Sequence, residues 1–126
     1  MAGESVLVVE DNEKNMKLVR DILQAMGYNP LEASSGEEAL ALAGENDPSL
    51  VLMDIQLPDI DGAEALRRLR SDERTTGIPV VALTAQAMQG ERERFLAAGF
   101  DGYLSKPVDV DELIETVGRY CDGSIE

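Results

Sequence analysis

Four short apolar runs, each followed directly by a polar or charged residue, constrain the fold of this chain more than any other feature. Aliphatic runs of this length are typical of parallel β-strands that are buried on both faces of a sheet. The runs and the residues after them are Val6–Val9 with Glu10 and Asp11, Leu50–Met53 with Asp54, Val80–Leu83 with Thr84, and Gly102–Ser105 with Lys106 and Pro107. Functional groups of open α/β sheets gather just beyond the carboxyl ends of the strands, so the pattern predicts one pocket lined by these polar side chains.

Segments with the apolar spacing of α-helices lie between these runs, and a weaker strand is predicted at Asn29–Ala33. The predicted helices run between Met16 and Gly27, from a cap at Ser35 to Asn46, from near Gly62, from about Met88 to Gly99, and from Asp109 to near Tyr120. Capping residues and glycines mark the ends of several of them. Five strands that alternate with five helices through short connections predict a parallel sheet covered by helices on both faces.

Two of the predicted helices carry a more detailed expectation about burial. In the helix that begins near Gly62, the leucines are expected to face the core and the arginines to face water; these are Leu66 and Leu69, and Arg67, Arg68 and Arg70. The last helix is expected to have one apolar face, made of Val110, Leu113, Ile114 and Val117.

The length and charge of the chain limit its organisation and its partners. A chain of 126 residues fits one domain, residues 1–126, with no effector domain after the last predicted helix. With 25 acidic and 11 basic side chains the net charge is −14, which argues against nucleic-acid binding because the phosphates would be repelled. The single cysteine, Cys121, excludes an internal disulfide, and no apolar stretch approaches a signal peptide or a membrane span. These features predict a cytoplasmic protein that does not insert into membranes and whose partners are proteins or cations.

The chain contains no histidine. This absence excludes a Ser-His-Asp triad, a Cys-His pair and histidine-ligated zinc. Any covalent chemistry must therefore use carboxylates, hydroxyls or lysine.

Three carboxylates at two strand ends, Glu10, Asp11 and Asp54, would repel one another unless a cation lay between them. Carboxylate oxygens without nitrogen or sulfur ligands suit Mg²⁺, and zinc is disfavoured. A simpler interpretation of the first pair is that Glu10 and Asp11 are loop carboxylates before a helix capped by Asn12.

A carboxylate beside Mg²⁺ can attack a phosphoryl group, and Asp54 is placed for that chemistry at the end of its strand. Lys106 would then neutralise the transferred charge, and the Thr84 hydroxyl would donate to a phosphoryl oxygen. Each residue also has a purely structural interpretation, since Thr84 is a β-branched strand end and Lys106 precedes a proline turn. The occurrence of all of them in order, at consecutive strand ends, favours the functional interpretation.

These residues together resemble the response-regulator receiver domain of two-component signalling. The matching motifs are Val6–Asn12, Leu52–Pro58, Pro79–Ala85 and Gly102–Pro107, and the resemblance extends over nearly the whole chain. It is nearest to DivK-like single-domain regulators and to the receivers of hybrid kinases. The resemblance implies a flavodoxin-like (βα)5 fold with a five-stranded sheet in the order 2-1-3-4-5.

The resemblance also implies a role for each residue of the predicted pocket. Asp54 would accept the phosphoryl group, Lys106 would sense it, and Thr84 and Tyr103 would form the switch pair. Mg²⁺ would be held by Glu10, Asp11, Asp54 and the backbone carbonyl of Gln56, with Glu10 in place of the aspartate that is commoner in the family. Gln56 and Gln86 would flank the path of the water that hydrolyses the phosphorylated aspartate.

The implied function is phosphoacceptance in a two-component phosphorelay, with Mg²⁺-dependent self-phosphorylation and autodephosphorylation as the only enzymatic activities. The phosphodonor would be a histidine kinase or a phosphotransfer protein, because this chain has no histidine to phosphorylate. Phosphorylation would change the face made by the fourth helix, the last strand and the fifth helix, where a downstream protein would bind.

Three alternatives remain open from the sequence. A flavodoxin-like flavin binder shares the strand order, but Glu10 and Asp11 would repel the flavin phosphate. A haloacid-dehalogenase-type phosphatase also phosphorylates an aspartate, but it normally has a second aspartate at the position of Gln56. The chain is also compatible with a receiver fragment of a hybrid kinase or of a longer multidomain regulator, although Met1 and the short tail favour a complete protein.

Overall fold

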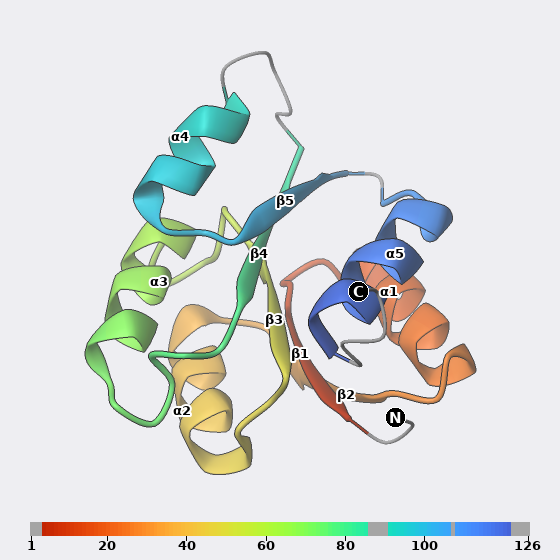
Figure 1. Cartoon of the computed structure of the whole chain (residues 1–126), viewed down its shortest axis with the longest axis horizontal. Helices are drawn as coiled ribbons and strands as arrows, with labels where there is room; N and C mark the ends of the chain where they lie inside the picture. The colour runs from red at the N-terminus through yellow and green to blue at the C-terminus, as the bar shows by residue number, and fades with distance from the viewer. Residues whose placement is uncertain (1–3, 86–90, 107, 122–126) are drawn as a thin grey trace.

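The computed structural model describes residues 4–85, 91–106 and 108–121, in which strands and helices alternate along the chain (Figure 1). The strands are β1 (Ser5–Val9), β2 (Asn29–Ala33), β3 (Leu50–Asp54), β4 (Val80–Thr84) and β5 (Gly102–Ser105). The helices are α1 (Glu13–Ala25), α2 (Gly36–Asn46), α3 (Gly62–Ser71), α4 (Glu91–Ala98) and α5 (Val110–Cys121). All strand pairs are parallel, and the sheet has the order β2-β1-β3-β4-β5. The predicted fold class and strand order are confirmed.

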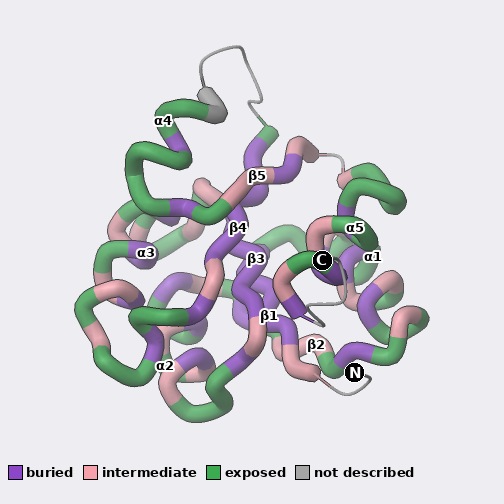
Figure 2. Tube along the Cα trace, in the orientation of Figure 1, coloured by how far each residue is buried: buried purple, intermediate pink, exposed green. Residues whose placement is uncertain are grey.

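The helices cover both faces of the sheet, with α1 and α5 on one face and α2, α3 and α4 on the other (Figure 1). Successive strand residues point to opposite faces, so Val51 and Met53 belong to the core under α2 and α3, whereas Leu50 and Leu52 belong to the core under α1 and α5. Every residue of β3 and β4 is buried. Figure 2 shows these central strands as a continuous buried band. This double burial explains why the strands read as unbroken apolar runs.

Four helices begin at a side chain that accepts a hydrogen bond from the backbone N–H three residues later, as the capping residues predict. The acceptors and donors are Asn12 with Asn15, Ser35 with Glu38, Asp61 with Glu64, and Asp109 with Glu112. After α1, Gly27 has a φ of 89°, a conformation that glycine adopts without the steric cost of a side chain.

One expectation about burial is wrong, that Arg70 faces water, and the apolar face of α5 is only partly buried. Val110 and Ile114 are 46% and 40% exposed, because the apolar face of α5 that meets the sheet is narrower and consists of Leu113, Val117 and Cys121. Arg70 does not simply face water: its guanidinium donates to the carbonyl of Ile78 at 2.6 Å and to Asp101 Oδ2 at 3.0 Å. The start of the fourth predicted helix, near Met88, lies outside the described residues.

Within the described part of the chain, no helix has both the length and the apolar character needed to cross a membrane.

Candidate functional site

The carboxyl ends of β1, β3 and β4 and the segment after β5 surround an open cleft of about 690 Å³. Its lining comes from four segments far apart in the sequence: Glu10, Asp11, Asn12, Asn15, Asp54, Gln56, Leu57, Pro58, Ala85 and Lys106. The structure thus brings together residues that the sequence predicts to share one pocket. Thr84 is buried at the end of β4, immediately before the lining residue Ala85.

The loop after β1 turns two neighbouring carboxylates to different environments. Glu10 is 3% exposed, and its Oε2 atom accepts a hydrogen bond from the Asn12 N–H at 3.2 Å. Asp11 is exposed at the mouth of the cleft. Asn12 itself caps α1, as the simpler interpretation of this segment expects. The structural role of Asn12 as a cap is therefore compatible with a functional role of Glu10 and Asp11, because the cap helps to fix the turn that orients these two carboxylates.

Asp54 lies at the end of β3 and is 5% exposed. Its Oδ1 atom accepts from the Gln56 N–H at 3.0 Å, and its Oδ2 atom accepts from Lys106 Nζ at 2.8 Å. The next residue, Ile55, continues the strand pairing by donating its N–H to the carbonyl of Leu83 at 3.0 Å. The Asp54 carboxylate is therefore oriented from both sides and faces the cleft.

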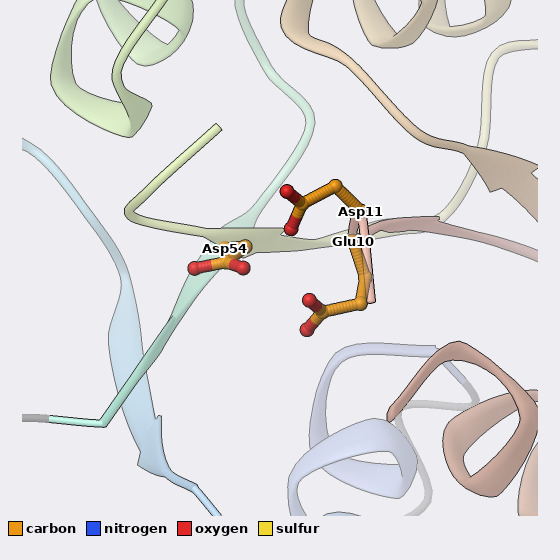
Figure 3. A group of neighbouring side chains, drawn as sticks. All are labelled: Glu10, Asp11 and Asp54. Carbon is orange, nitrogen blue, oxygen red and sulfur yellow. The ribbon is translucent and has the colours of Figure 1, made fainter. Parts of the chain in front are cut away.

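Oxygen atoms of Glu10, Asp11 and Asp54 lie within 4.8 Å of one another. Figure 3 shows that the Glu10 and Asp11 side chains extend from the end of β1 in different directions and that all three carboxyl groups border a common space. Glu10 Oε1 is buried and accepts no hydrogen bond from the described residues, although Lys106 Nζ lies 2.8 Å away as an ion-pair partner. Three converging carboxylates beside the Lys106 ammonium carry more negative charge than this one cation offsets, which fits a further small cation that prefers oxygen ligands, such as Mg²⁺.

Lys106 joins two of these carboxylates. Its ammonium lies 2.8 Å from Asp54 Oδ2 and 2.8 Å from Glu10 Oε1, and its backbone N–H donates to the carbonyl of Thr84 at 2.8 Å. Burial by itself lowers the pKa of Lys106, but the contacts with Asp54 and Glu10 raise this pKa overall. Burial raises the pKa of Glu10, with Asp54 adding to the rise and Lys106 opposing it. The Lys106 ammonium thus offsets the negative charges of both Glu10 and Asp54.

The remaining predicted residues are Tyr103, Gln56 and Gln86. Tyr103 on β5 is partly buried, and its ring centroid lies 6.0 Å from that of Phe95 on α4. Gln56 is exposed and lines the cleft. Gln86 lies outside the described residues. The pairing of β4 with β5 places Tyr103 opposite Ala82 and Ser105 opposite Thr84.

Sequence reasoning missed several residues that line the cleft, namely Asn15, Leu57, Pro58 and Ala85. Asn15 carries a readable signal, because it follows the cap residue Asn12 by one helical turn and therefore faces the same end of α1. Leu57 and Pro58 lie in a loop whose path depends on contacts with a distant helix, so their position has no local signal.

Comparisons with known proteins agree with this geometry. Residues 6–118 match the response regulator receiver domain family. The polar-differentiation response regulator DivK of Brucella ovis is 50% identical over 117 residues, which make up 93% of this chain and 95% of that protein.

Two solved structures share the fold along nearly the whole chain. The receiver domain of a sensor histidine kinase of Pseudomonas aeruginosa, solved with a magnesium ion in its active-site cleft, has a TM-score of 0.86 and 38% identity, covering 94% of this chain and 98% of that one. The receiver domain of the response regulator Ssk1 of Saccharomyces cerevisiae was solved with the histidine phosphotransfer protein Ypd1. It has a TM-score of 0.86 and 30% identity, covering 94% of this chain and 89% of that one.

Proposed function

Because the chain belongs to the response regulator receiver domain family, we propose that it transmits a signal by accepting a phosphoryl group on Asp54 and by changing the face that it presents to a protein partner. One observation carries the proposal: Asp54 lies in the cleft with Lys106 at 2.8 Å on one oxygen and two further carboxylates beside it. Asp54 is the member of this set at the end of the buried central strand β3, where its backbone is held by strand pairing.

The cation that fits the site is Mg²⁺, held by Glu10, Asp11, Asp54 and the backbone carbonyl of Gln56. When bound, Mg²⁺ supplies positive charge that offsets the charge of the transferred phosphoryl group. The three carboxylates of this chain would contribute oxygen ligands, and their mutual repulsion favours binding of a cation between them.

A carboxylate oxygen of Asp54 attacks the phosphorus of a phosphohistidine in line, so a new O–P bond forms as the N–P bond breaks and the histidine nitrogen leaves. The ammonium of Lys106 moves from pairing two carboxylates to neutralising the phosphoryl group. The Thr84 hydroxyl donates to a phosphoryl oxygen, and the Tyr103 ring turns further inward against Phe95. The donor is a histidine kinase or phosphotransfer protein, since the chain has no histidine of its own, and we place this transfer in the cytoplasm.

Water that attacks the phosphorylated Asp54 in line ends the signal. By the family resemblance, this step would be controlled by Gln56, which lines the cleft, and by Gln86, which lies outside the described residues. Neither side chain is a carboxylate that could act as a general base. The same functions apply whether the chain acts alone or as the receiver of a hybrid kinase or a longer regulator.

The test of the proposed function is phosphorylation by acetyl phosphate. Intact-mass measurement should find one added phosphoryl group per chain in the presence of Mg²⁺ and none when the metal is chelated. No increase in mass with acetyl phosphate or with any of a panel of phosphorylated kinases would refute phosphoacceptance. Sustained hydrolysis of a generic phosphate ester would favour a phosphatase, and visible absorption by the purified protein would favour a flavin binder.

Removing one cluster carboxylate should weaken the stabilisation by Mg²⁺. Asp11→Asn is expected to reduce the rise in melting temperature that millimolar Mg²⁺ gives to the wild-type protein, because a ligand that binds only the native state stabilises it by about 2.7 kcal/mol at 100 times its Kd. Asp47→Asn is a matched control, since Asp47 is an exposed carboxylate with a left-handed φ of 49° that asparagine tolerates. Equal Mg²⁺ responses in both variants would remove Asp11 from the metal site.

The signalling face should depend on the Tyr103 ring. In the wild-type protein, phosphorylation is expected to shift the backbone amide resonances of β5 and of its neighbours in α4 and α5, because the ring packs on Phe95 between these elements. Tyr103→Ala should keep Asp54 phosphorylation but lose most of these shifts and any phosphorylation-dependent partner binding. Tyr103→Phe preserves the packing and should retain the shifts. Wild-type shifts in Tyr103→Ala would place the output on another face.

A further inference from the structure

The loop that connects Asp54 to α3 is tied to a second helix as well as to the sheet. At its near end, the Ile55 N–H pairs with Leu83, and the Ile55 carbonyl accepts from the Gly62 N–H at 2.8 Å. At its far end, Asp61 caps α3. Asp59 lies between these two ends, and its side chain extends to neither β3 nor α3. Its contacts are with the start of α2, more than twenty residues earlier in the chain.

The carboxylate of Asp59 binds the first two amides of α2. Its Oδ1 atom accepts from the Gly36 N–H at 2.8 Å, and its Oδ2 atom accepts from the Glu37 N–H at 2.9 Å. These backbone hydrogen bonds hold the pKa of Asp59 below its usual value, and the one from Glu37 has the largest effect. The next amide, of Glu38, donates to Ser35 Oγ at 3.2 Å. The N-terminus of α2 is therefore capped by two side chains, one local and one from the loop after Asp54.

The contact is close enough to fix the loop as well as the helix. A Cβ atom added to Gly36 would lie 2.3 Å from Ile60 Cγ1, so any larger residue here would force the Ile60 side chain to move. On the outer side, Arg68 of α3 pairs with Glu37 of α2 at 2.9 Å. Ile60 packs against the core, and α2 itself packs on the sheet. Asp59 is thus anchored to a rigid part of the molecule.

The segment between the two anchors borders the cleft. Gln56, Leu57 and Pro58 line the cleft beside Asp54, with Ile55 held by β4 on one side and Asp59 held by α2 on the other. The path of Gln56 is therefore determined at both ends. Without the α2 contact, the segment would keep the Gln56 hydrogen bond to Asp54 and the packing of Leu57 and Ile60, but it would lose its polar contact with α2, and the Gln56 carbonyl would have more freedom.

We infer that Asp59 is a positioning residue for the cation site: by binding the N-terminus of α2, it holds the Gln56 carbonyl in place to act as a ligand. The inference rests on the proposed function, which assigns that carbonyl to Mg²⁺. It gives α2 a role in the site although α2 contributes no residue to the cleft described above. Partners that orient ligands in this way typically change metal affinity by about 10–100-fold when removed.

Asp59→Ala is expected to weaken Mg²⁺ binding roughly tenfold, at the lower end of the range for orienting partners, because the loop keeps its other anchors. The measurement is a titration of the full chain with Mg²⁺, followed by calorimetry or by amide resonances, with no phosphodonor present. Asp59→Asn retains one acceptor oxygen and should restore part of the affinity. The proposed function is tested separately by phosphorylation, so a wild-type chain that binds Mg²⁺ but accepts no phosphoryl group would refute that function and leave this inference standing.

Ser35→Ala is the matched control. It removes a cap from the same helix end and leaves the Asp59 contact intact. A purely structural role predicts that both alanine variants lower stability and neither changes Mg²⁺ affinity. Equal affinity in Asp59→Ala and the wild-type protein would overturn the inference, and so would an equal loss of affinity in Ser35→Ala.

A measurement on the wild-type chain covers the case in which Asp59→Ala does not fold. Linkage is reciprocal, so a cation that fixes Gln56 must also strengthen the Asp59 contact. Saturating Mg²⁺ is expected to slow hydrogen exchange of the Gly36 and Glu37 amides relative to the Glu38 amide, which Ser35 caps. Unchanged exchange at Gly36 and Glu37, or a wild-type chain that binds no Mg²⁺, would overturn the inference.

Discussion

Asp54→Asn is expected to abolish phosphorylation by acetyl phosphate, to below the detection limit of intact-mass measurement. The amide keeps the shape of the side chain and an oxygen that can accept from the Gln56 N–H, but a neutral amide oxygen is a far weaker nucleophile than a carboxylate. The variant should fold, because it removes one negative charge from a cluster of three carboxylates. The loss would therefore be a loss of chemistry and not of structure.

Asp61→Asn provides the matched control for this experiment. Asp61 lies in the same loop and caps α3 by accepting from the Glu64 N–H at 2.8 Å, a role that asparagine fills equally well. The control should be phosphorylated like the wild-type protein. Labelling of Asp54→Asn to the wild-type level would show that another residue is the nucleophile, and proteolytic mapping of the labelled peptide would identify it.

Lys106→Met is expected to lower the free energy of unfolding in metal-free buffer and to increase the stabilisation by Mg²⁺. Methionine fills the space of the lysine stem but leaves Glu10 and Asp54 buried without their cation. Losing one partner of a fully buried pair costs about 3–5 kcal/mol, and we expect roughly 2–4 kcal/mol because the Lys106 side chain is 15% exposed. Mg²⁺ should restore much of this stability, since it no longer competes with an ammonium for the same oxygens.

The measurement is chemical denaturation with and without Mg²⁺, alongside Lys17→Met as the control. Lys17 pairs with Asp21 at 2.6 Å on the surface, where its side chain is 68% exposed, so its removal should cost less than about 1 kcal/mol and leave the Mg²⁺ response unchanged. Phosphorylation of Lys106→Met by acetyl phosphate should also be much slower than in the wild-type protein. Equal stabilities of Lys106→Met and the wild-type chain would mean that the buried carboxylates do not need this ammonium.

The sequence predicts the strands of this fold well because their residues are buried on both faces. The weak strand Asn29–Ala33 has the predicted bounds, although Asn29 and Glu32 are exposed, because it pairs with β1 at the edge of the sheet. The pocket residues Glu10, Asp54 and Lys106 are equally accessible to sequence reasoning, since each directly follows an apolar run. Side chains that follow the ends of parallel strands lie at the same edge of the sheet, so their positions in the sequence alone predict that they lie close together.

Features that depend on partners distant in the sequence had no such signal. The period of α5 correctly predicts the burial of Leu113 and Val117, but the width of the buried stripe depends on how the helix lies on the sheet, which leaves Val110 and Ile114 exposed. Asp59 reads as an ordinary turn residue, yet it caps a helix that begins more than twenty residues earlier. Side chains with several possible partners are assigned only when the fold brings one of those partners near.

Strand β5 lies at the edge of the sheet, pairs with β4 alone, and has four residues. It carries Tyr103, and Lys106 follows it directly, so the ammonium of the cleft and the aromatic ring that packs on Phe95 belong to one short segment. Edge strands open more readily than central ones, and the opening is a local event that does not require global unfolding. Each such opening would withdraw the ammonium from Asp54 and the ring from Phe95 at the same moment. Charge compensation in the cleft and the packing of the Tyr103 ring therefore both depend on one four-residue edge strand.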